Sequence, residues 1–449
     1  MLTTLGVLKL KNGSDSQELK TIYEEEGLRG KYQFVYVGLA ICDELVLVVY
    51  PKYFRKRQPT FEQIRQVLRA IRKSSGGISQ MAALTEEGLR QNDKVALMLA
   101  LLEMYGEYGI YTNHQKEYEI NGSGAISWDR TINFHHPHLK NGKPVYLEYE
   151  TGKLTQDNSD YVTRLHKSVL TECSKFMEKS GLADLLALDP IELSDEPVED
   201  FGEKPFIDYQ LERESSVQFI TWKQELLVML RRYINDDEAF VESNNITCLG
   251  TSSFYHIWEE GCKIAFDDMA GRRLSKLPIK LPSGLREQRD EKLIEIIPSP
   301  KWYVYDGEGF RLSGESDTLI PDIVTLWGEG DSADTFAILD AKYYSPSLKG
   351  KPRNVPDLGS ITKQYLYQSA YKELIKNCGF DHVVNAFLVP CEDEDMRLAG
   401  KVEFLDVFEQ MPEPFTNDVK MWLVPVEKIW DCYLENKSMG MEEIRRLSE

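Results

Sequence analysis

The first half of the chain alternates between short apolar runs that favour strands and longer segments with helical periodicity. Residues 33–37 and 45–50 are rich in Val, Tyr and Leu and flank a polar turn at 42–44, which predicts two paired strands. A helix is predicted to begin after Thr60, because the spacing to Gln63 is that of a capping box. The other elements expected here are a helix capped by Asp93 with a buried apolar run at 95–102, strand-like segments at 109–112 and 144–149, and an amphipathic helix over 160–179.

The second half has a different order of elements, in which strands are gathered between helical regions. Helices are expected at 217–234, 253–266 and 360–376, and strands at 302–305, 320–327, 336–343 and 383–389. This succession predicts an α/β core with mixed strand pairing. The first half, with few strands and short helices, is typical of a small mixed α/β adaptor module and shows no catalytic pattern of its own.

An acidic segment separates the two halves. The stretch 192–203 contains six acidic side chains, one proline and no basic residue. Repulsion among like charges disfavours compact packing, so this stretch predicts a linker or an exposed hinge. The expected organisation is an N-terminal adaptor domain over 1–190, an acidic linker over 191–204 and a C-terminal domain over 205–449. A solvated loop inside one domain is the alternative interpretation.

Composition narrows the class of protein. The 449 residues include 53 Lys and Arg against 73 Asp and Glu, a net charge of −20, which excludes a surface that is basic all over but allows a local basic groove. Seven scattered cysteines without a C-x-x-C pair indicate reduced thiols rather than disulfides or a zinc site. The sequence shows no signal peptide and no apolar run long enough to span a bilayer, so we expect a cytoplasmic protein with no membrane partner.

Two predicted strands direct carboxylates and a lysine toward one place. Asp340 and Lys342 are two residues apart on one strand and therefore share a face. A hairpin with the preceding strand can bring Asp322 close to Asp340. An aspartate that follows the apolar run 336–339 is costly to bury unless it forms an ion pair or binds a metal, which favours a functional role. A salt-bridged hairpin is the structural alternative.

Two carboxylates and an ammonium group suit the hydrolysis of a phosphodiester. Carboxylates hold Mg²⁺, which stabilises charge on the phosphate and acidifies a bound water, while Lys342 positions or activates that water. The carbonyl of Ala341 is a further candidate metal ligand. The arrangement resembles the PD-(D/E)xK nuclease motif, here Pro321-Asp322 followed by Asp340-Ala341-Lys342.

This resemblance implies two further site residues. The segment 363–371 resembles the helix of RecB-like members in which a Gln orients the site and contacts the DNA backbone. Gln364 is the first choice and Gln368 the alternative, because neither has the usual spacing to a tyrosine; aromatic core packing with surface glutamines is the other interpretation. Glu259, on the helix before the core strands, is a candidate metal-site acid, with a surface glutamate as the alternative.

Longer runs of sequence extend the resemblance over most of the chain. These runs are 124–133, 254–259, 320–327, 338–344 and 363–372. They are similar to LlaJI-type restriction endonucleases, relatives of the McrC nuclease subunit that works with an McrB-type GTPase. The resemblance implies cleavage of double-stranded DNA by a C-terminal PD-(D/E)xK core, a mixed sheet flanked by helices, and an N-terminal half that docks an McrB-like AAA+ GTPase.

The sequence contains no G-x-x-x-x-G-K-[ST] nucleotide-binding loop, so any nucleotide-driven step requires another polypeptide. In the family picture an inserted finger of the McrC-like subunit stimulates the GTPase ring. Trp128, Asp129 and Arg130 are the candidates for this contact, and a solvated turn is the alternative.

Basic residues gather in two places despite the acidic total. The segment 271–292 has seven basic and three acidic side chains, and a second basic turn follows the strand of Asp340. The candidate phosphate-binding residues are Arg272, Arg273, Lys276, Lys280, Lys349, Lys351 and Arg353. The leading hypothesis is a Mg²⁺-dependent endonuclease subunit of a restriction system. A self-sufficient type II restriction endonuclease and a non-catalytic adaptor that binds DNA or a ring ATPase are the alternatives.

Overall fold

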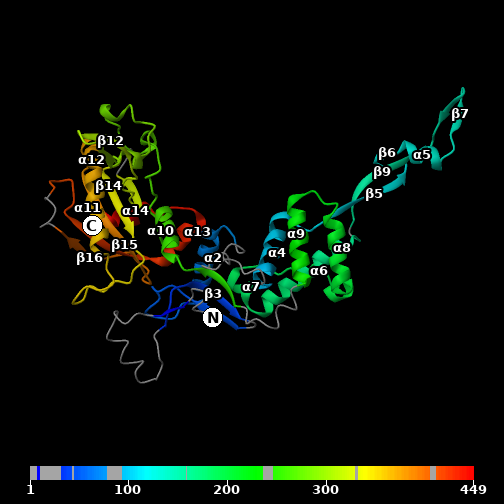
Figure 1. Cartoon of the computed structure of the whole chain (residues 1–449), viewed down its shortest axis with the longest axis horizontal. Coiled ribbons are helices and arrows are strands. Elements are labelled where there is room, and N and C mark those ends of the chain that lie inside the picture. The colour runs from blue at the N-terminus through cyan, green and yellow to red at the C-terminus, as the bar shows by residue number, and fades with distance from the viewer. Residues whose placement is uncertain are drawn as a thin grey trace, which may run out of the picture.

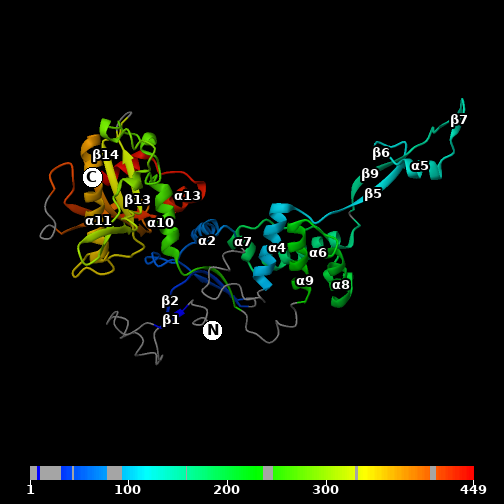
Figure 2. The same cartoon turned by 45° about the horizontal axis from the view of Figure 1, so that its top comes forward.

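The computed structural model describes residues 8–10, 32–42, 45–77, 94–157, 159–235, 246–328, 332–404 and 411–448. Within these ranges the chain is a mixed α/β structure with several separate sheets. Figure 1 shows a helix-covered C-terminal sheet at one end, a small N-terminal sheet beside it, a cluster of helices in the middle and a thin arm at the other end. Figure 2 shows the same order of parts in a turned view.

The N-terminal strands form a three-stranded antiparallel sheet. Its middle strand is β3 (Val37–Cys42), which pairs with β4 (Leu45–Val49) and β10 (Ile246–Thr251). The strand predicted at 45–50 is confirmed as β4, whereas that predicted at 33–37 is wrong, because only Val37 of this range lies in β3 and residues 33–34 belong to a separate strand pair. Because β10 comes from the second half of the sequence, the two halves share this sheet. A separate antiparallel pair consists of β1 (Leu8–Leu10) and β2 (Tyr32–Phe34).

Helix α2 (Phe61–Ser75) begins with the predicted capping box. The Thr60 hydroxyl accepts the backbone N–H of Gln63 at 3.3 Å, and the Gln63 side chain accepts the N–H of Thr60 at 2.8 Å. The Gln63 amide also donates to Glu427 of α13 (Val426–Glu435), against which α2 packs. The N-terminal sheet and its helix are therefore attached directly to the C-terminal part.

A cluster of helices follows. It consists of α4 (Lys94–Tyr108), α6 (Tyr161–Lys179), α7 (Leu182–Leu186), α8 (Lys204–Ser215) and α9 (Thr221–Asn235). The apolar run at 95–102 is buried almost throughout, as predicted. Asp93, predicted to cap α4, lies outside the described residues. Asp160 caps α6 by accepting the N–H of Thr163 at 2.9 Å, which confirms the helix predicted over 160–179.

The acidic segment 191–204 packs along α6 within this cluster. Arg164 of α6 forms an ion pair with Glu196, and the short 3₁₀ helix Val198–Phe201 places the Phe201 ring in the core. Contacts from α6 thus compensate part of the negative charge on which the expectation of exposure rested. The segment is a packed loop in this structure.

Between α4 and α6 the chain leaves the cluster as the long arm seen in Figures 1 and 2. The arm contains β5 (Asn113–Ile120), β6 (Ala125–Ile126), α5 (Trp128–Phe134), β7 (His138–Lys140), β8 (Lys143–Val145) and β9 (Glu150–Asp157). Strands β5 and β6 pair with β9, and β7 pairs with β8. The strand predicted at 109–112 is wrong, and that predicted at 144–149 is wrong beyond Val145, because a strand forms only where a partner strand accepts its main-chain hydrogen bonds.

The C-terminal part is built on a five-stranded sheet in the order β13-β14-β15-β17-β16. Its strands are β13 (Ile323–Trp327), β14 (Thr335–Ala341), β15 (His382–Cys391), β16 (Arg397–Glu403) and β17 (Asp418–Pro425). The strands β14, β15 and β17 are parallel, whereas β13 and β16 are antiparallel to their neighbours. The predicted mixed pairing is confirmed, and β16 and β17 were not anticipated.

Helices cover both faces of this sheet. One face packs on α10 (Phe254–Ala265) and α13, and the other on α11 (Leu358–Ala370), α12 (Lys372–Cys378) and the segment 269–297. The helix predicted over 360–376 is therefore interrupted, at Tyr371.

Smaller elements complete the C-terminal part. These are η2 (Leu274–Lys276), η3 (Ser283–Leu285), η4 (Leu293–Ile296), β11 (Lys301–Tyr305), β12 (Phe310–Glu315), α14 (Met441–Arg445) and η5 (Arg446–Ser448). The strand predicted at 302–305 exists as β11, but it pairs only with β12 in an exposed hairpin outside the central sheet. In the described parts of the chain, no helix combines the length and the apolar character needed to cross a membrane.

Candidate active site

The antiparallel pairing of β13 and β14 brings two aspartates together. Ile323 is paired with Leu339, so the same register places Asp322, just before β13, opposite Asp340. The two carboxyl groups are hydrogen-bonded to each other. The Asp322 carboxylate also accepts the backbone N–H of Ala341 at 3.1 Å. These contacts fix both side chains at one end of the hairpin.

Lys342 joins this pair from the chain just beyond β14. Its Nζ atom lies 2.8 Å from Oδ1 of Asp340, whose side chain is only 7% exposed. The backbone N–H of Lys342 donates to the carbonyl of Leu388 at 2.9 Å, which holds the chain against β15. Burial lowers the pKa of Lys342, but the negative charge of Asp340 outweighs this effect, so the pKa lies above its ordinary value. The ammonium group is therefore protonated and available as a donor.

The crowded carboxyl groups change the acidity of the site. Burial, the hydrogen bond to Asp340 and the negative charges of Asp340 and Glu259 together raise the pKa of the Asp322 carboxyl to about 8, against the opposing effect of Lys342. Lys342 supplies one positive charge, which is not enough to let two carboxyl groups this close both ionise at neutral pH. One added cation would allow both to be anionic, which is the electrostatic condition for a metal site.

Glu259 approaches the pair from α10. Its charge acts on Asp322, but its carboxylate is held by Lys263 one turn later, with Nζ 2.6 Å from Oε1. Among the described residues, no group of three or more His, Cys, Asp or Glu side chains is close enough to hold a metal ion together. The metal-binding roles of Glu259 and of the Ala341 carbonyl remain predictions, and the two aspartates are the core of the candidate site.

The structure distinguishes the two glutamines of α11. The side chain of Gln364 is fully buried, and both of its amide atoms lack a hydrogen-bond partner within the described residues. Gln368 is also buried, but its amide donates to the carbonyl of Thr416 at 2.9 Å and accepts the N–H of Thr416 at 3.3 Å. Gln368 is therefore held by the main chain of Thr416, whereas the amide of Gln364 is buried without a hydrogen-bond partner among the described residues, and its role in orienting the site remains a prediction.

Separate substitutions of the two glutamines to leucine should have opposite effects. In Gln364→Leu no hydrogen bond is lost, so the midpoint of urea unfolding should stay constant or rise while DNA cleavage falls by about tenfold or more. In Gln368→Leu the main chain of Thr416 loses both partners, which should destabilise the protein by about 2 kcal/mol and spare cleavage. The reverse pattern would reject Gln364 as the residue that orients the site.

Two residues that support the site were not singled out from the sequence. Asp268 follows α10, and its Oδ1 accepts the N–H of Val324 at 2.9 Å, which fixes the start of β13. Tyr367 of α11 donates its hydroxyl to the carbonyl of Ile320 at 2.9 Å, two residues before Asp322. Burial and the charges of Asp322 and Asp340 raise the pKa of Tyr367 to about 12. The only sequence signal was the position of Tyr367 one turn after Gln364.

Comparison with known proteins identifies the family. The family model described as LlaJI restriction endonuclease matches residues 36–278 and 287–417, which together make up most of the chain. The chain belongs to the LlaJI restriction endonuclease family. Membership implies a DNA-cleaving nuclease. The second matched range includes β13, β14 and α11, and so the aspartate pair, Lys342 and Gln364.

A curated relative supports the same grouping. The chain is 26% identical over 437 residues to the Type II restriction enzyme BsuMI component YdjA of Bacillus subtilis (strain 168). The alignment covers 94% of this chain and 85% of the relative. The similarity therefore extends over both halves of this LlaJI-family chain, including the arm.

The predicted basic residues of this family member are exposed but differ in their pairing. Arg272 pairs with Asp267, and Arg273 lies 3.9 Å from Asp290. The second basic turn, which contains Lys349 and Lys351, is closed by two hydrogen bonds of 3.0 Å between the main chains of Ser347 and Arg353. The predicted DNA-binding residues with exposed side chains are Arg272, Arg273, Lys276, Lys280, Lys349, Lys351 and Arg353.

The candidate partner contact of this family member lies on the arm. Trp128, Asp129 and Arg130 form the first turn of α5, and Trp128 is 53% exposed. The Arg130 guanidinium lies over the Tyr118 ring at 4.1 Å and over the Phe134 ring at 4.9 Å. The arm also exposes further large apolar side chains, among them Ile120, Ile126, Ile132, Leu139, Leu147 and Leu154. The three candidates are thus held on a projecting, partly apolar surface.

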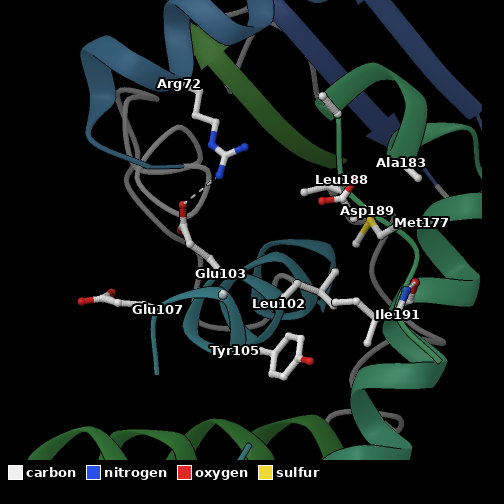
Figure 3. A pocket seen from close by; sticks show the side chains of 13 residues that line it. Arg72, Leu102, Glu103, Tyr105, Glu107, Met177, Ala183, Leu188, Asp189 and Ile191 are labelled. Carbon is white, nitrogen blue, oxygen red and sulfur yellow. Dashed lines mark hydrogen bonds and ion pairs between the residues drawn. The ribbon is translucent and has the colours of Figure 1, made fainter. Parts of the chain in front are cut away.

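A pocket of about 500 Å³ lies in the helical part, separate from the aspartate pair (Figure 3). Arg72 of α2 and Glu103 of α4 face each other there at 4.0 Å, and Glu107 and Asp189 also line it. None of the residues predicted to act on DNA is among the residues that line this pocket.

Proposed function

We propose that this LlaJI-family chain is the Mg²⁺-dependent endonuclease subunit of a restriction system, with a PD-(D/E)xK core over the C-terminal part. The observation that carries the proposal is the hydrogen-bonded pair Asp322 and Asp340 with Lys342 at 2.8 Å, buried at one end of a hairpin. Family membership supplies the substrate class, double-stranded DNA.

The residues present fit a hard divalent cation. The donors are oxygens, from Asp322, Asp340 and the Ala341 carbonyl, and Lys342 balances only one of the two carboxylate charges, which agrees with the raised pKa of Asp322. When bound, Mg²⁺ would neutralise charge on the phosphate and acidify a water. Glu259 could contribute a further carboxylate after release from Lys263.

The protein groups act by position and charge. The Lys342 ammonium, protonated beside Asp340, can donate a hydrogen bond to the attacking water or to a non-bridging phosphate oxygen, and it places positive charge where negative charge develops. The buried hairpin keeps these groups in a fixed arrangement, since Asp322 is tied to the main chain of Ala341. Gln364 orients the site from α11.

The test is an assay of the full chain, alone and with an AAA+ GTPase from the same restriction system, on supercoiled plasmid with and without Mg²⁺. Cleavage that requires the GTPase and its nucleotide supports the proposal. Cleavage by the chain alone without nucleotide would instead select a self-sufficient type II endonuclease. No cleavage by the wild-type chain under any condition, with partner binding unaffected by Asp322→Ala, would select a non-catalytic adaptor.

We place the GTPase contact on the arm. The double substitution Trp128→Ala, Arg130→Ala should reduce the stimulation of GTP hydrolysis by about tenfold or more, because an exposed aromatic and an arginine are typical interface anchors. The measurement is the GTPase rate of the partner titrated with each variant. Glu117→Ala, also exposed on the arm, is the matched control and should stimulate normally. Equal stimulation by the double variant would move the contact elsewhere.

A further inference from the structure

A short basic loop joins the N-terminal sheet to α2. The 52–57 loop, Lys52-Tyr53-Phe54-Arg55-Lys56-Arg57, contains four cationic side chains and no acid. All four of these basic residues are exposed, whereas Tyr53 and Phe54 are only 3% and 8% exposed. The loop therefore presents its charge outward from an apolar anchor.

The anchor fixes the 52–57 loop against the chain that leaves the candidate active site. The backbone N–H of Lys52 donates to the Tyr343 hydroxyl at 3.1 Å, and the Ser345 hydroxyl donates to the Lys52 carbonyl at 3.4 Å. The Lys52 ammonium lies 4.4 Å from the centroid of the Tyr343 ring. Tyr343 is the residue directly after Lys342, so a loop from the N-terminal half adjoins the proposed catalytic strand.

Packing from other elements makes this position firm. The Tyr53 hydroxyl accepts a hydrogen bond of 3.0 Å from the indole N–H of Trp430, and the Tyr53 ring contacts Tyr343 and Phe254. Residues of α10, of α13 and of the chain just beyond β14 thus all hold the same loop. A rigid support reduces the entropy lost when arginines bind a ligand.

The charges of the loop are only partly compensated. Lys56 pairs with Asp393, and the carboxylate of Glu392 accepts the backbone N–H groups of Arg55 and Lys56 at 3.2 and 2.9 Å. Asp393 is shared with Arg397 at 2.9 Å. The guanidinium groups of Arg55 and Arg57 have no ion pair within the described residues. Burial and the charge of Arg55 lower the pKa of Lys52, as expected where positive charges adjoin without compensation.

We propose that the 52–57 loop binds the phosphate backbone of the duplex DNA that is cut at the aspartate pair; this inference rests on the proposed nuclease function. Duplex DNA carries one phosphate charge per about 1.7 Å of its axis, so a duplex seated on Asp340 presents several phosphates to the segments beside Lys342. The arginine fork matches phosphate oxygens. The basic turn closed by Ser347 and Arg353 follows Ser345, which contacts Lys52. Two basic segments therefore lie beside the chain that leaves the candidate active site.

The test measures the binding constant K of the full chain for a fluorescein-labelled 30-bp duplex of mixed sequence. Fluorescence anisotropy in EDTA gives K at each concentration of a salt series. Arg55→Gln, Arg57→Gln should lower the slope of log K against log salt by about 2, since each phosphate contact contributes about 0.9, and should weaken binding about tenfold near 0.1 M salt. Lys175→Gln, Arg213→Gln on α6 and α8, which removes two exposed cations from the helical cluster, is the matched control and should match wild type.

Plasmid cleavage measured on the same samples separates this inference from the nuclease proposal. If the wild-type chain cuts DNA but the Arg55, Arg57 variant has an unchanged salt slope, DNA binding by the 52–57 loop is rejected and the nuclease proposal is kept. If the variant has a reduced salt slope but the wild-type chain never cuts DNA, the 52–57 loop is kept as a DNA-binding site and the nuclease proposal is rejected. A wild-type chain that does not bind the duplex in low salt overturns the loop.

Discussion

Asp340→Asn should abolish Mg²⁺-dependent cleavage, lowering the rate by at least about 10³-fold. The amide preserves the shape of the buried side chain but removes the negative charge that pairs with Lys342 and that a cation would require. The measurement is the rate of plasmid nicking and linearisation under the conditions in which the wild-type chain cuts. Lys342→Ala should be inactive for the complementary reason, the loss of the positive charge beside the phosphate.

The matched control is Asp317→Asn, an exposed aspartate five residues before Asp322, which should retain wild-type cleavage. EDTA should stop the wild-type reaction, and excess Mg²⁺ should restore it. Full activity of Asp340→Asn or Lys342→Ala would falsify the site assignment, whatever the family membership.

Asp322→Asn should make the metal-free protein more stable while it removes cleavage. The folded-state pKa of Asp322 is about 8, above the ordinary value of 3.8, so the folded chain binds this proton more tightly than the unfolded chain. Stability of the metal-free protein should therefore fall as pH rises from about 4 to about 8. Asparagine can still accept the N–H of Ala341 and carries no charge, so it should remove this loss, which amounts to several kcal/mol.

The measurement is urea unfolding in EDTA at pH 5 and pH 8.5. The difference between Asp322→Asn and wild type should be small at pH 5 and large at pH 8.5, and Mg²⁺ should stabilise wild type at pH 8.5 but not the variant. Asp317→Asn should show no such dependence. An Asp322→Asn variant that is less stable than wild type at pH 8.5 would contradict the electrostatic description of the pair.

Local patterns predicted individual elements well. The capping box predicted at Thr60 and the helix predicted over 160–179 appear in the structure, because a cap and a helical turn are satisfied by groups close in sequence. The pattern failed where pairing with other strands decides. The strand predicted at 144–149 ends at Val145, because β8 pairs only with the short strand β7, and β10 from the second half of the chain completes the sheet of β3 and β4.

The acidic segment shows the same limit for charge. Six acids in twelve residues argue for exposure when counted alone. In the structure Arg164 of α6 pairs with Glu196, and Phe201 anchors the segment in the core. Local charge density alone therefore predicts exposure, but contacts with α6 and with the core decide that the segment packs.

The residue types of the candidate site were visible in the sequence, and the roles of several were not. Gln364 and Gln368 could not be separated until the structure showed Gln368 bonded to Thr416 and Gln364 buried without a partner. Asp268 was not visible as a site residue, because a side chain that supports a strand fifty-six residues away has no local signature.

The sequence by itself determined that two neighbouring strands would bring Asp322, Asp340 and Lys342 together, and that the family is a restriction endonuclease family, since both depend on residue order. In the structure only Asp340 lies within a strand, because Asp322 precedes β13 and Lys342 follows β14. Only the tertiary structure decided that the two carboxyl groups share a hydrogen bond and that the 52–57 loop adjoins Tyr343. The physical reason is that proximity between distant segments depends on packing of the whole core. Periodicity specifies which face of an element is buried, but not which other element covers it.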